Sequence, residues 1–175
     1  MTSSVSASQA VRDASVAILN QLADTLESFT DEQYTAQGPA GAATGGHVRH
    51  TLDHYRKLAD GHANANTVAY DRRERGGSIE TDRAAAIAEA RDLASTFESL
   101  DETQMGFPVK ICAMVSGDGC EAEIDSTLVR ELWFASHHAI HHAALMKPIA
   151  AAVGIELPAA FGRAPSTVNH ESASR

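Results

Sequence analysis

The longest helical pattern in this chain lies at residues 127–154 and reads TLVRELWFASHHAIHHAALMKPIAAAVG. Its apolar side chains recur every three or four positions, which is the period of one buried helix face. The pattern predicts a helix that begins near Ser126 or Thr127, ends at Gly154 and is about 40 Å long. We expect a kink at Pro148, because proline lacks the backbone N–H that a helix interior uses.

Three shorter patterns of the same period precede this segment. They run over residues 11–29, from Thr44 or Gly46 to Asp60, and over residues 82–100. Gly61 is expected to end the second of these helices, and Thr81 to cap the third. Apolar residues make up 43% of the chain and aromatic ones only 5%, which favours helix-on-helix packing over a sandwich of aromatic strands. The sequence therefore predicts an all-α fold built as a four-helix bundle.

A different period marks residues 107–126, where side chains alternate around a Ser-Gly-Asp-Gly turn. Alternation of this kind predicts a small β-hairpin before the last helix. In a tight turn, Val115 faces Cys120, and Cys112 lies on the opposite face of the hairpin. The two cysteines are therefore expected to be free thiols, and neither has a base beside it in the sequence that would make it a nucleophile.

The length of 175 residues fits one domain, spanning residues 1–175, that buries a core without disulfide support. The predicted core covers about residues 6–154. Residues 155–175 show no clear period. We therefore expect an extended C-terminal tail that wraps the outside of the bundle or frays.

The charge balance excludes some partners. Fourteen Lys and Arg stand against 23 Asp and Glu, so the net charge is −9 and a nucleic acid backbone would be repelled. The polar N-terminal residues 1–9 lack a basic region and an apolar run, and no stretch of about 18 apolar residues occurs. The expectation is a soluble, cytoplasmic protein without nucleic acid or membrane partners.

Histidines fall into two groups that together hold eight of the nine in the chain. They are His47, His50, His54 and His62 on or near one predicted helix, and His137, His138, His141 and His142 on the last one. At about 100° per residue, His47, His50 and His54 lie within roughly 60° and form one stripe. On the last helix, His138 and His142 share one face, whereas the other pair is rotated by about 100°. Only one of these pairs can point at the bundle axis.

Such spacing suits a metal site. Two imidazoles four residues apart, with a third from a facing helix, supply three nitrogen donors at about 2.0–2.1 Å and leave positions open for water or substrate. Bundles commonly build metal sites from inward-facing side chains on opposed helices. The alternative for any single histidine is an exposed side chain or a core residue bonded to a carbonyl. The joint spacing of the two groups favours the metal site.

The two histidine-rich segments read GHVRHTLDHY at residues 46–55 and SHHAIHH at residues 136–142. They resemble two signatures of the DinB/YfiT-like metalloenzyme superfamily. The run ELWFASHH and the later FGRAPST at residues 161–167 resemble one bacterial subgroup of it, so the resemblance covers nearly the whole chain. It implies a four-helix bundle with an up, down, down, up order of helices. It also implies a homodimer.

The resemblance further implies a divalent ion, nickel or zinc, held by three histidines. Carried over by motif, these ligands are His50, His138 and His142. Four more histidines depart from the family's pattern: His47 and His54, which are possible additional ligands, and His137 and His141. Family members with known chemistry include S-transferases that use a low-molecular-weight thiol, a maleylpyruvate isomerase and hydrolase-like proteins.

Other side chains have a candidate role and an ordinary alternative. Glu131 shares a face with His138 and could orient a ligand histidine or act as a base, or it could be an exposed acid in the first helical turn. Asp53 and Tyr55 lie near the histidine stripe, but a surface carboxylate and a core tyrosine are the favoured interpretations. A cluster of arginines could bind an anionic substrate or form a solvated charge run; it comprises Arg72, Arg73 and Arg75.

Three functions are consistent with the sequence. The first is a metal-dependent enzyme for a small-molecule substrate, in which the ion lowers the pKa of bound water or of a thiol, as hydrolysis and thiol transfer both require. The second is a metal-binding or sensing bundle without turnover. The third is a structural bundle whose histidines form a polar network without metal.

Overall fold

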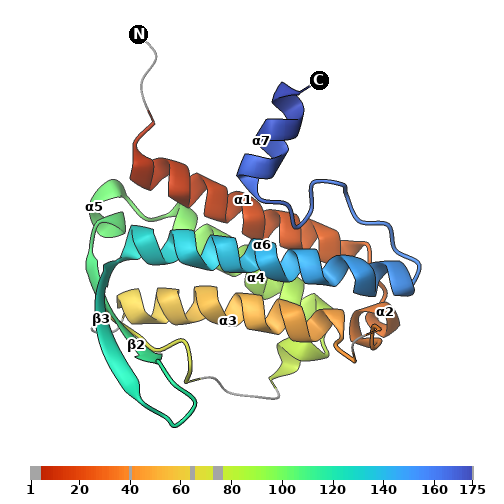
Figure 1. Cartoon of the computed structure of the whole chain (residues 1–175), viewed down its shortest axis with the longest axis horizontal. Coiled ribbons are helices and arrows are strands. Elements are labelled where there is room, and N and C mark those ends of the chain that lie inside the picture. The colour runs from red at the N-terminus through yellow and green to blue at the C-terminus, as the bar shows by residue number, and fades with distance from the viewer. Residues whose placement is uncertain (1–4, 40, 64–65, 73–76, 175) are drawn as a thin grey trace.

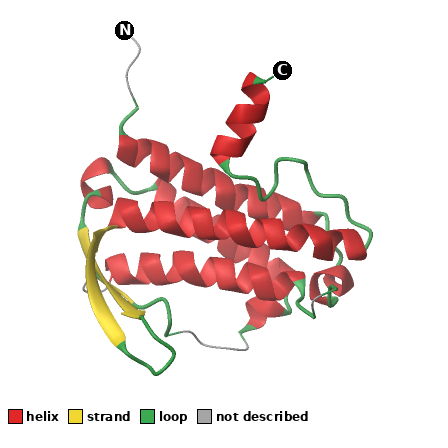
Figure 2. Ribbon diagram, viewed as in Figure 1, coloured by secondary structure: helices red, strands yellow, loops and turns green. Residues whose placement is uncertain are grey.

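The computed structural model describes residues 5–39, 41–63, 66–72 and 77–174, and most of them are helical (Figures 1 and 2). Within these ranges the α-helices are α1 Ala7–Glu27, α2 Asp31–Thr35, α3 Thr44–Ala63, α4 Arg83–Glu98, α5 Glu102–Met105, α6 Leu128–Ala152 and α7 Pro165–Ala173. A 3₁₀ turn covers Ser78–Glu80, and the strands are β1 Thr67–Val68, β2 Pro108–Met114 and β3 Glu121–Thr127.

The four long helices form the bundle. α1 packs against α4 and α6, and α3 packs against the same two helices, so the four close into a ring around one core. The largest fully buried side chains come from all four helices and their connections; they include Leu19, Leu26, Leu52, Tyr55, Leu58, Phe97, Leu132 and Met146. The predicted bundle of helices is confirmed. It could be predicted from the sequence because the apolar period is a property of each segment by itself.

A small sheet stands at one end of the bundle, so the fold is not strictly all-α. β2 and β3 form the predicted antiparallel hairpin, and the Val115 N–H donates to the Cys120 carbonyl at 2.8 Å. Cys112 and Cys120 are free, as expected. β1 pairs in parallel with β2. No strand was predicted at β1 from the sequence, because its two residues find their partners far along the chain.

The sequence predicted that Gly61 ends the second long helix, and this prediction is wrong. α3 continues through it to Ala63. A Cβ atom at Gly61 would lie 2.6 Å from the Val68 side chain and 2.8 Å from the Thr67 carbonyl oxygen. The glycine therefore permits the close approach of β1 to α3. The cap of α4 is also one residue later than predicted: the Asp82 side chain accepts from the Ala85 N–H at 2.9 Å.

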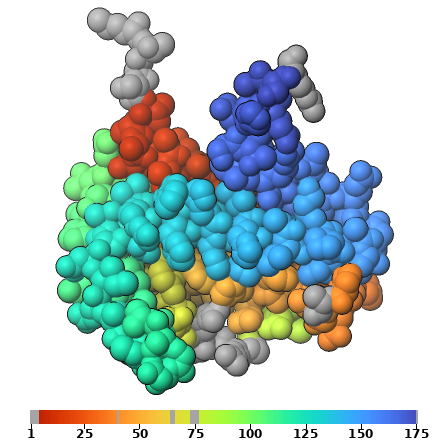
Figure 3. Space-filling view, viewed as in Figure 1, coloured from red at the N-terminus to blue at the C-terminus, as the bar shows by residue number. Residues whose placement is uncertain are grey.

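The C-terminal residues are not an extended tail. α6 runs through Pro148 to Ala152, and a further helix, α7, begins with a proline in its first turn, where the missing N–H costs nothing. None of the described residues of α7 is buried, and Figures 1 and 3 show this helix standing clear of the bundle beside α1. Phe161, only 2% exposed, anchors the segment that leads to α7.

The sequence predicted a protein without a membrane partner, and the helices of the structure bear on this prediction. Within the described ranges, none of them combines the length and the apolar character needed to cross a bilayer.

Candidate metal centre

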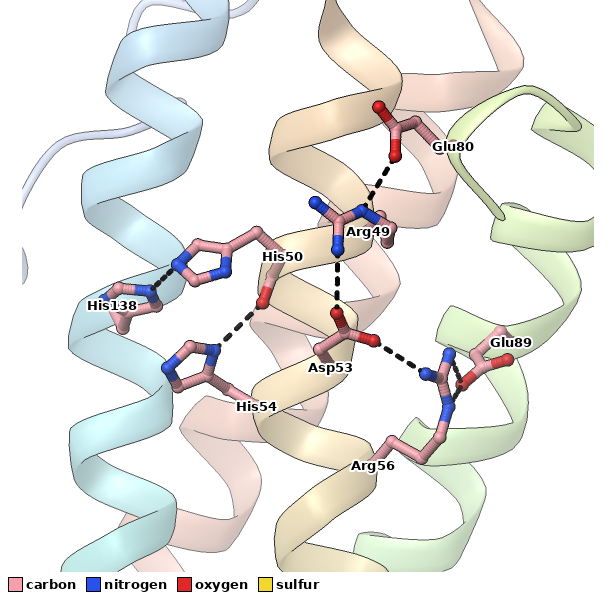
Figure 4. Close-up of polar contacts among 8 residues, drawn as sticks. All are labelled: Arg49, His50, Asp53, His54, Arg56, Glu80, Glu89 and His138. Carbon is pink, nitrogen blue, oxygen red and sulfur yellow. Dashed lines mark hydrogen bonds and ion pairs between the residues drawn. The ribbon is translucent and has the colours of Figure 1, made fainter. Parts of the chain in front are cut away.

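Histidines from α3 and α6 meet inside the bundle. The two helices pack side by side and run in opposite directions in Figure 1. Among the described residues, His50, His138 and His142 form a group in which one ligand nitrogen from each lies within 4.8 Å of the others. His50 and His138 point toward each other, with their Nε2 atoms 2.9 Å apart (Figure 4).

This trio fits a divalent ion. Metal–nitrogen bonds of about 2.0–2.1 Å allow two ligand nitrogens to lie up to about 4.2 Å apart around one ion. Small rotations of half-buried imidazoles would therefore suffice to close the site. The three donors suit zinc or nickel in a site that keeps open positions. The structure brings the predicted ligands together, and their binding of a metal stays a prediction.

The structure also separates the two histidine pairs of α6. The rings of His138 and His142 both face α3, each within 4.8 Å of the His50 ring, centroid to centroid. His137 and His141 are exposed, and the His137 ring packs against Trp133 on the outer face. Helical geometry makes this division unavoidable, because the two pairs are rotated by about 100°.

His47 lies at the edge of the trio. Its Nδ1 atom is 2.9 Å from Nδ1 of His142, so one of the two nitrogens donates a hydrogen bond to the other. A cavity of about 500 Å³ opens beside this pair and is also lined by His50, Arg49 and Glu80. His50 and His142 of the trio are therefore accessible to a small molecule from the side on which His47 lies.

His54 borders the trio on its other side. Its Nδ1–H donates to the His50 carbonyl at 2.9 Å, one helical turn earlier, and its ring centroid is 4.1 Å from that of His138 (Figure 4). Tyr70 stacks on the His54 ring at 5.1 Å. The carbonyl bond fixes the orientation of His54, and the stacked rings close this side of the site.

Burial lowers the pKa of two histidines at the site, His142 and His47. Removal from water, together with the neighbouring His138 and His47, lowers the pKa of His142 to about 3. Burial also lowers the pKa of His47, and the nearby His141 adds to this effect. A neutral imidazole retains the lone pair that a metal ligand must offer, so these environments favour metal binding at neutral pH.

The metal-free protein is expected to lose stability as the pH falls from about 7 to about 5. In the unfolded chain His47 and His142 take up protons near their ordinary pKa of 6.5, whereas the fold holds both pKa values lower. The unfolded state then binds more protons, and the free energy of unfolding rises with pH between about 3 and about 6.5. Urea denaturation of chelator-treated protein at several pH values measures this slope. His142→Gln should flatten it, and equal slopes in variant and wild type would contradict the depressed pKa.

Comparison with solved structures identifies the architecture. YfiT from Bacillus subtilis matches with a TM-score of 0.51 over 89% of this chain and 94% of its own, at 18% sequence identity. The chain has the YfiT-like fold. YfiT itself is described as a probable metal-dependent hydrolase with an unusual four-helix bundle topology. At this level of identity, the likeness establishes the YfiT-like fold and not the activity.

Sequence comparison finds a curated protein that is similar to part of this chain. FK506-binding protein 5 of Rhizopus delemar is 32% identical over 118 residues, which are 67% of this chain and 31% of that protein. The chain with the YfiT-like fold thus spans about a third of the length of this curated relative. No family model matches the chain.

Glu131 is buried deep in the YfiT-like bundle, at 2% exposure, so its interpretation as an exposed helix acid is wrong. Its carboxylate accepts hydrogen bonds from the Tyr70 hydroxyl at 3.0 Å, the Ser126 hydroxyl at 2.7 Å and the Arg130 guanidinium at 2.8 Å. These three donors offset the cost of burying the charge. Burial and the Glu131 charge raise the pKa of Tyr70. Glu131 thus reaches the histidines through Tyr70, which stacks on His54.

Asp53 is also buried, at 6% exposure, and its interpretation as a surface carboxylate is wrong. It pairs with Arg56 at 2.7 Å and with Arg49 at 3.4 Å. Arg49 continues to Glu80 at 3.0 Å, and Arg56 continues to Glu89 on α4. Figure 4 shows these ion pairs on the side of α3 away from His50 and His54. The network fastens α3 to α4 and leaves the opposite face for the histidines.

The remaining candidates have structural places. Tyr55 is fully buried, as predicted, and its hydroxyl donates to Ser136 at 3.2 Å. Arg72 is exposed and pairs with Glu121 at 3.2 Å, while Arg73 and Arg75 lie outside the described residues. Tyr70 and Phe134, whose rings neighbour the histidines, were not singled out from the sequence. Phe134 lies four residues before His138 on α6, so the helical period could have identified it, whereas no local period connects Tyr70 with the site.

Proposed function

We propose that this protein is a divalent-metal-dependent enzyme whose ion is held by His50, His138 and His142. The convergence of one nitrogen from each side chain within 4.8 Å carries the proposal. The description of YfiT as a probable metal-dependent hydrolase supports it by analogy of fold. Nickel or zinc is the proposed ion, because three neutral imidazoles suit both.

The chemistry follows from an open position in the site. A bound ion would polarise a substrate oxygen or lower the pKa of water or of a thiol. The chain supplies the remainder: three imidazoles, the half-buried surroundings that keep His142 neutral, and a polar cavity of about 500 Å³ beside His47 and His142. Hydrolysis and transfer to a low-molecular-weight thiol are the proposed reaction types. Both place a small polar substrate in this cavity.

The cavity favours an enzyme over a metal-binding or sensing bundle without turnover. A closed structural site needs four protein ligands, whereas the described residues offer a group of three. A histidine network without metal is the third candidate, and the 2.9 Å contact between His50 and His138 supports it, since one ring can donate to the other. The homodimer and the up, down, down, up helix order belong to this proposal, and the chain directions in Figure 1 support the latter.

The first test is the metal content of protein purified without a histidine tag. Elemental analysis is expected to find about one divalent ion per chain, and loading the chelated protein with Zn²⁺ or Ni²⁺ should restore it. Ester and thiol-transfer assays on the loaded protein then separate the enzyme from the sensing bundle. Failure of both ions to bind would leave the histidine network as the remaining function of the cluster.

A further inference from the structure

We propose that His47 is a positioning residue that selects the metal-binding tautomer of His142. In this arrangement Nδ1–H of His142 donates to Nδ1 of His47, which leaves the lone pair of His142 Nε2 for the ion. The inference rests on the proposed function, because it concerns the same site. It assigns a role to a histidine that departs from the family's three-ligand pattern.

The contact itself restricts the protonation of both rings. The two Nδ1 atoms lie 2.9 Å apart, with ring centroids at 5.2 Å and planes tilted by 44°. Two lone pairs cannot face each other at this distance, so one Nδ1 atom carries the hydrogen. If His142 carries it, Nε2 of His142 is a free ligand. If His47 carries it, neutral His142 is protonated at Nε2 and cannot bind the ion.

The shared hydrogen decides which nitrogen of His142 is available as a ligand. The contact of 2.9 Å between the two Nδ1 atoms holds this one hydrogen between the rings. Only one of its two tautomeric arrangements allows His142 to join His50 and His138 around an ion.

Metal-bound histidines generally donate their second N–H to a carboxylate, a carbonyl or water. Glu131, the carboxylate nominated for this task, instead accepts from Tyr70, Ser126 and Arg130. His47 occupies the corresponding place beside His142. It lies three residues before His50 on α3, so one turn of one helix supplies both a ligand and the orienting partner of another ligand.

The first experiment uses the chelated, metal-free protein. Long-range ¹⁵N–¹H correlation spectra of its imidazoles should show His142 protonated at Nδ1. His47→Ala should shift His142 toward the Nε2–H tautomer, whereas the amide oxygen of His47→Gln can still accept and should preserve the wild-type pattern. A wild-type spectrum with His142 protonated at Nε2 would overturn the proposal.

The second experiment measures Zn²⁺ affinity by competition with a chromophoric chelator. His47→Ala should weaken binding by about 10- to 100-fold, the usual effect of losing an orienting partner, and should alter the visible spectrum of the Co²⁺-loaded protein. His47→Gln should recover most of the affinity. His137→Ala removes an exposed imidazole from α6 and serves as the matched control, with unchanged affinity.

These outcomes separate the two proposals. If the wild-type protein binds Zn²⁺ and His47→Ala leaves the affinity unchanged, the role of His47 is contradicted but the proposed metal site is not. If the wild-type protein binds neither Zn²⁺ nor Co²⁺, both the proposed function and the role of His47 towards an ion are contradicted. The metal-free spectra still decide which nitrogen holds the shared hydrogen.

Discussion

Replacing His50 by alanine is expected to abolish stoichiometric metal binding. His50 is the member of the trio that α3 contributes, and its loss leaves two histidines from a single helix. Two donors four residues apart cannot complete a three-coordinate protein site. The Zn²⁺ affinity should therefore fall by more than about 100-fold, beyond the effect of losing an orienting partner.

Competition with a chromophoric chelator measures this loss, and circular dichroism confirms that the variant remains helical. His137→Ala provides the control, because that imidazole is exposed and packs on Trp133 instead of the trio. Retention of one tightly bound ion by His50→Ala would rule out the proposed set of ligands. The same measurement on His138→Ala and His142→Ala tests each remaining ligand.

Replacing Asp53 by alanine is expected to lower the free energy of unfolding by about 2–3 kcal/mol. The substitution removes the carboxylate between Arg49 and Arg56, two charges that are themselves partly buried. The effect should lie at or below the lower end of the range for breaking a buried ion pair, because each arginine keeps a second acidic partner, Glu80 or Glu89. For a domain of this length, the melting temperature should fall by about 5–10 °C.

Urea denaturation tests this expectation, with Asp13→Ala as the matched control. Asp13 also pairs with an arginine, Arg12 at 3.0 Å, but its side chain is 55% exposed. An exposed pair contributes about 0–1 kcal/mol, so the control should remain near wild-type stability. Equal effects of the two substitutions would show that Asp53 does not hold α3 in place. Because Asp53 faces away from the histidines, its variant should keep most of its Zn²⁺ affinity.

The helices could be predicted because their signals are local. An apolar period of three or four residues arises within one segment, and a hairpin turn also depends on neighbouring residues. The sheet was only partly predicted, because β1 consists of two residues that pair with Lys110 and Ile111, far along the chain. Gly61 illustrates the same limit: its role depends on Val68 packing against it.

Two buried carboxylates, Asp53 and Glu131, show which charged contacts could have been predicted from the sequence. Asp53 lies four residues after Arg49 and three before Arg56, a helical spacing that favours ion pairs, so these two pairs could have been predicted from the sequence. The burial of Glu131 was not readable. One of its donors, Tyr70, comes from a segment without a clear period, and only the folded chain brings the two together.

The convergence of His50 and His138 across 88 positions of the chain has a consequence for unfolding kinetics. An ion shared by α3 and α6 would act as a removable cross-link that closes a long loop, and such links restrict the entropy of the open chain. Amide hydrogens along both helices would then exchange more slowly with the ion than without it. Chelation would convert a slowly opening bundle into one whose two histidine-bearing helices separate readily.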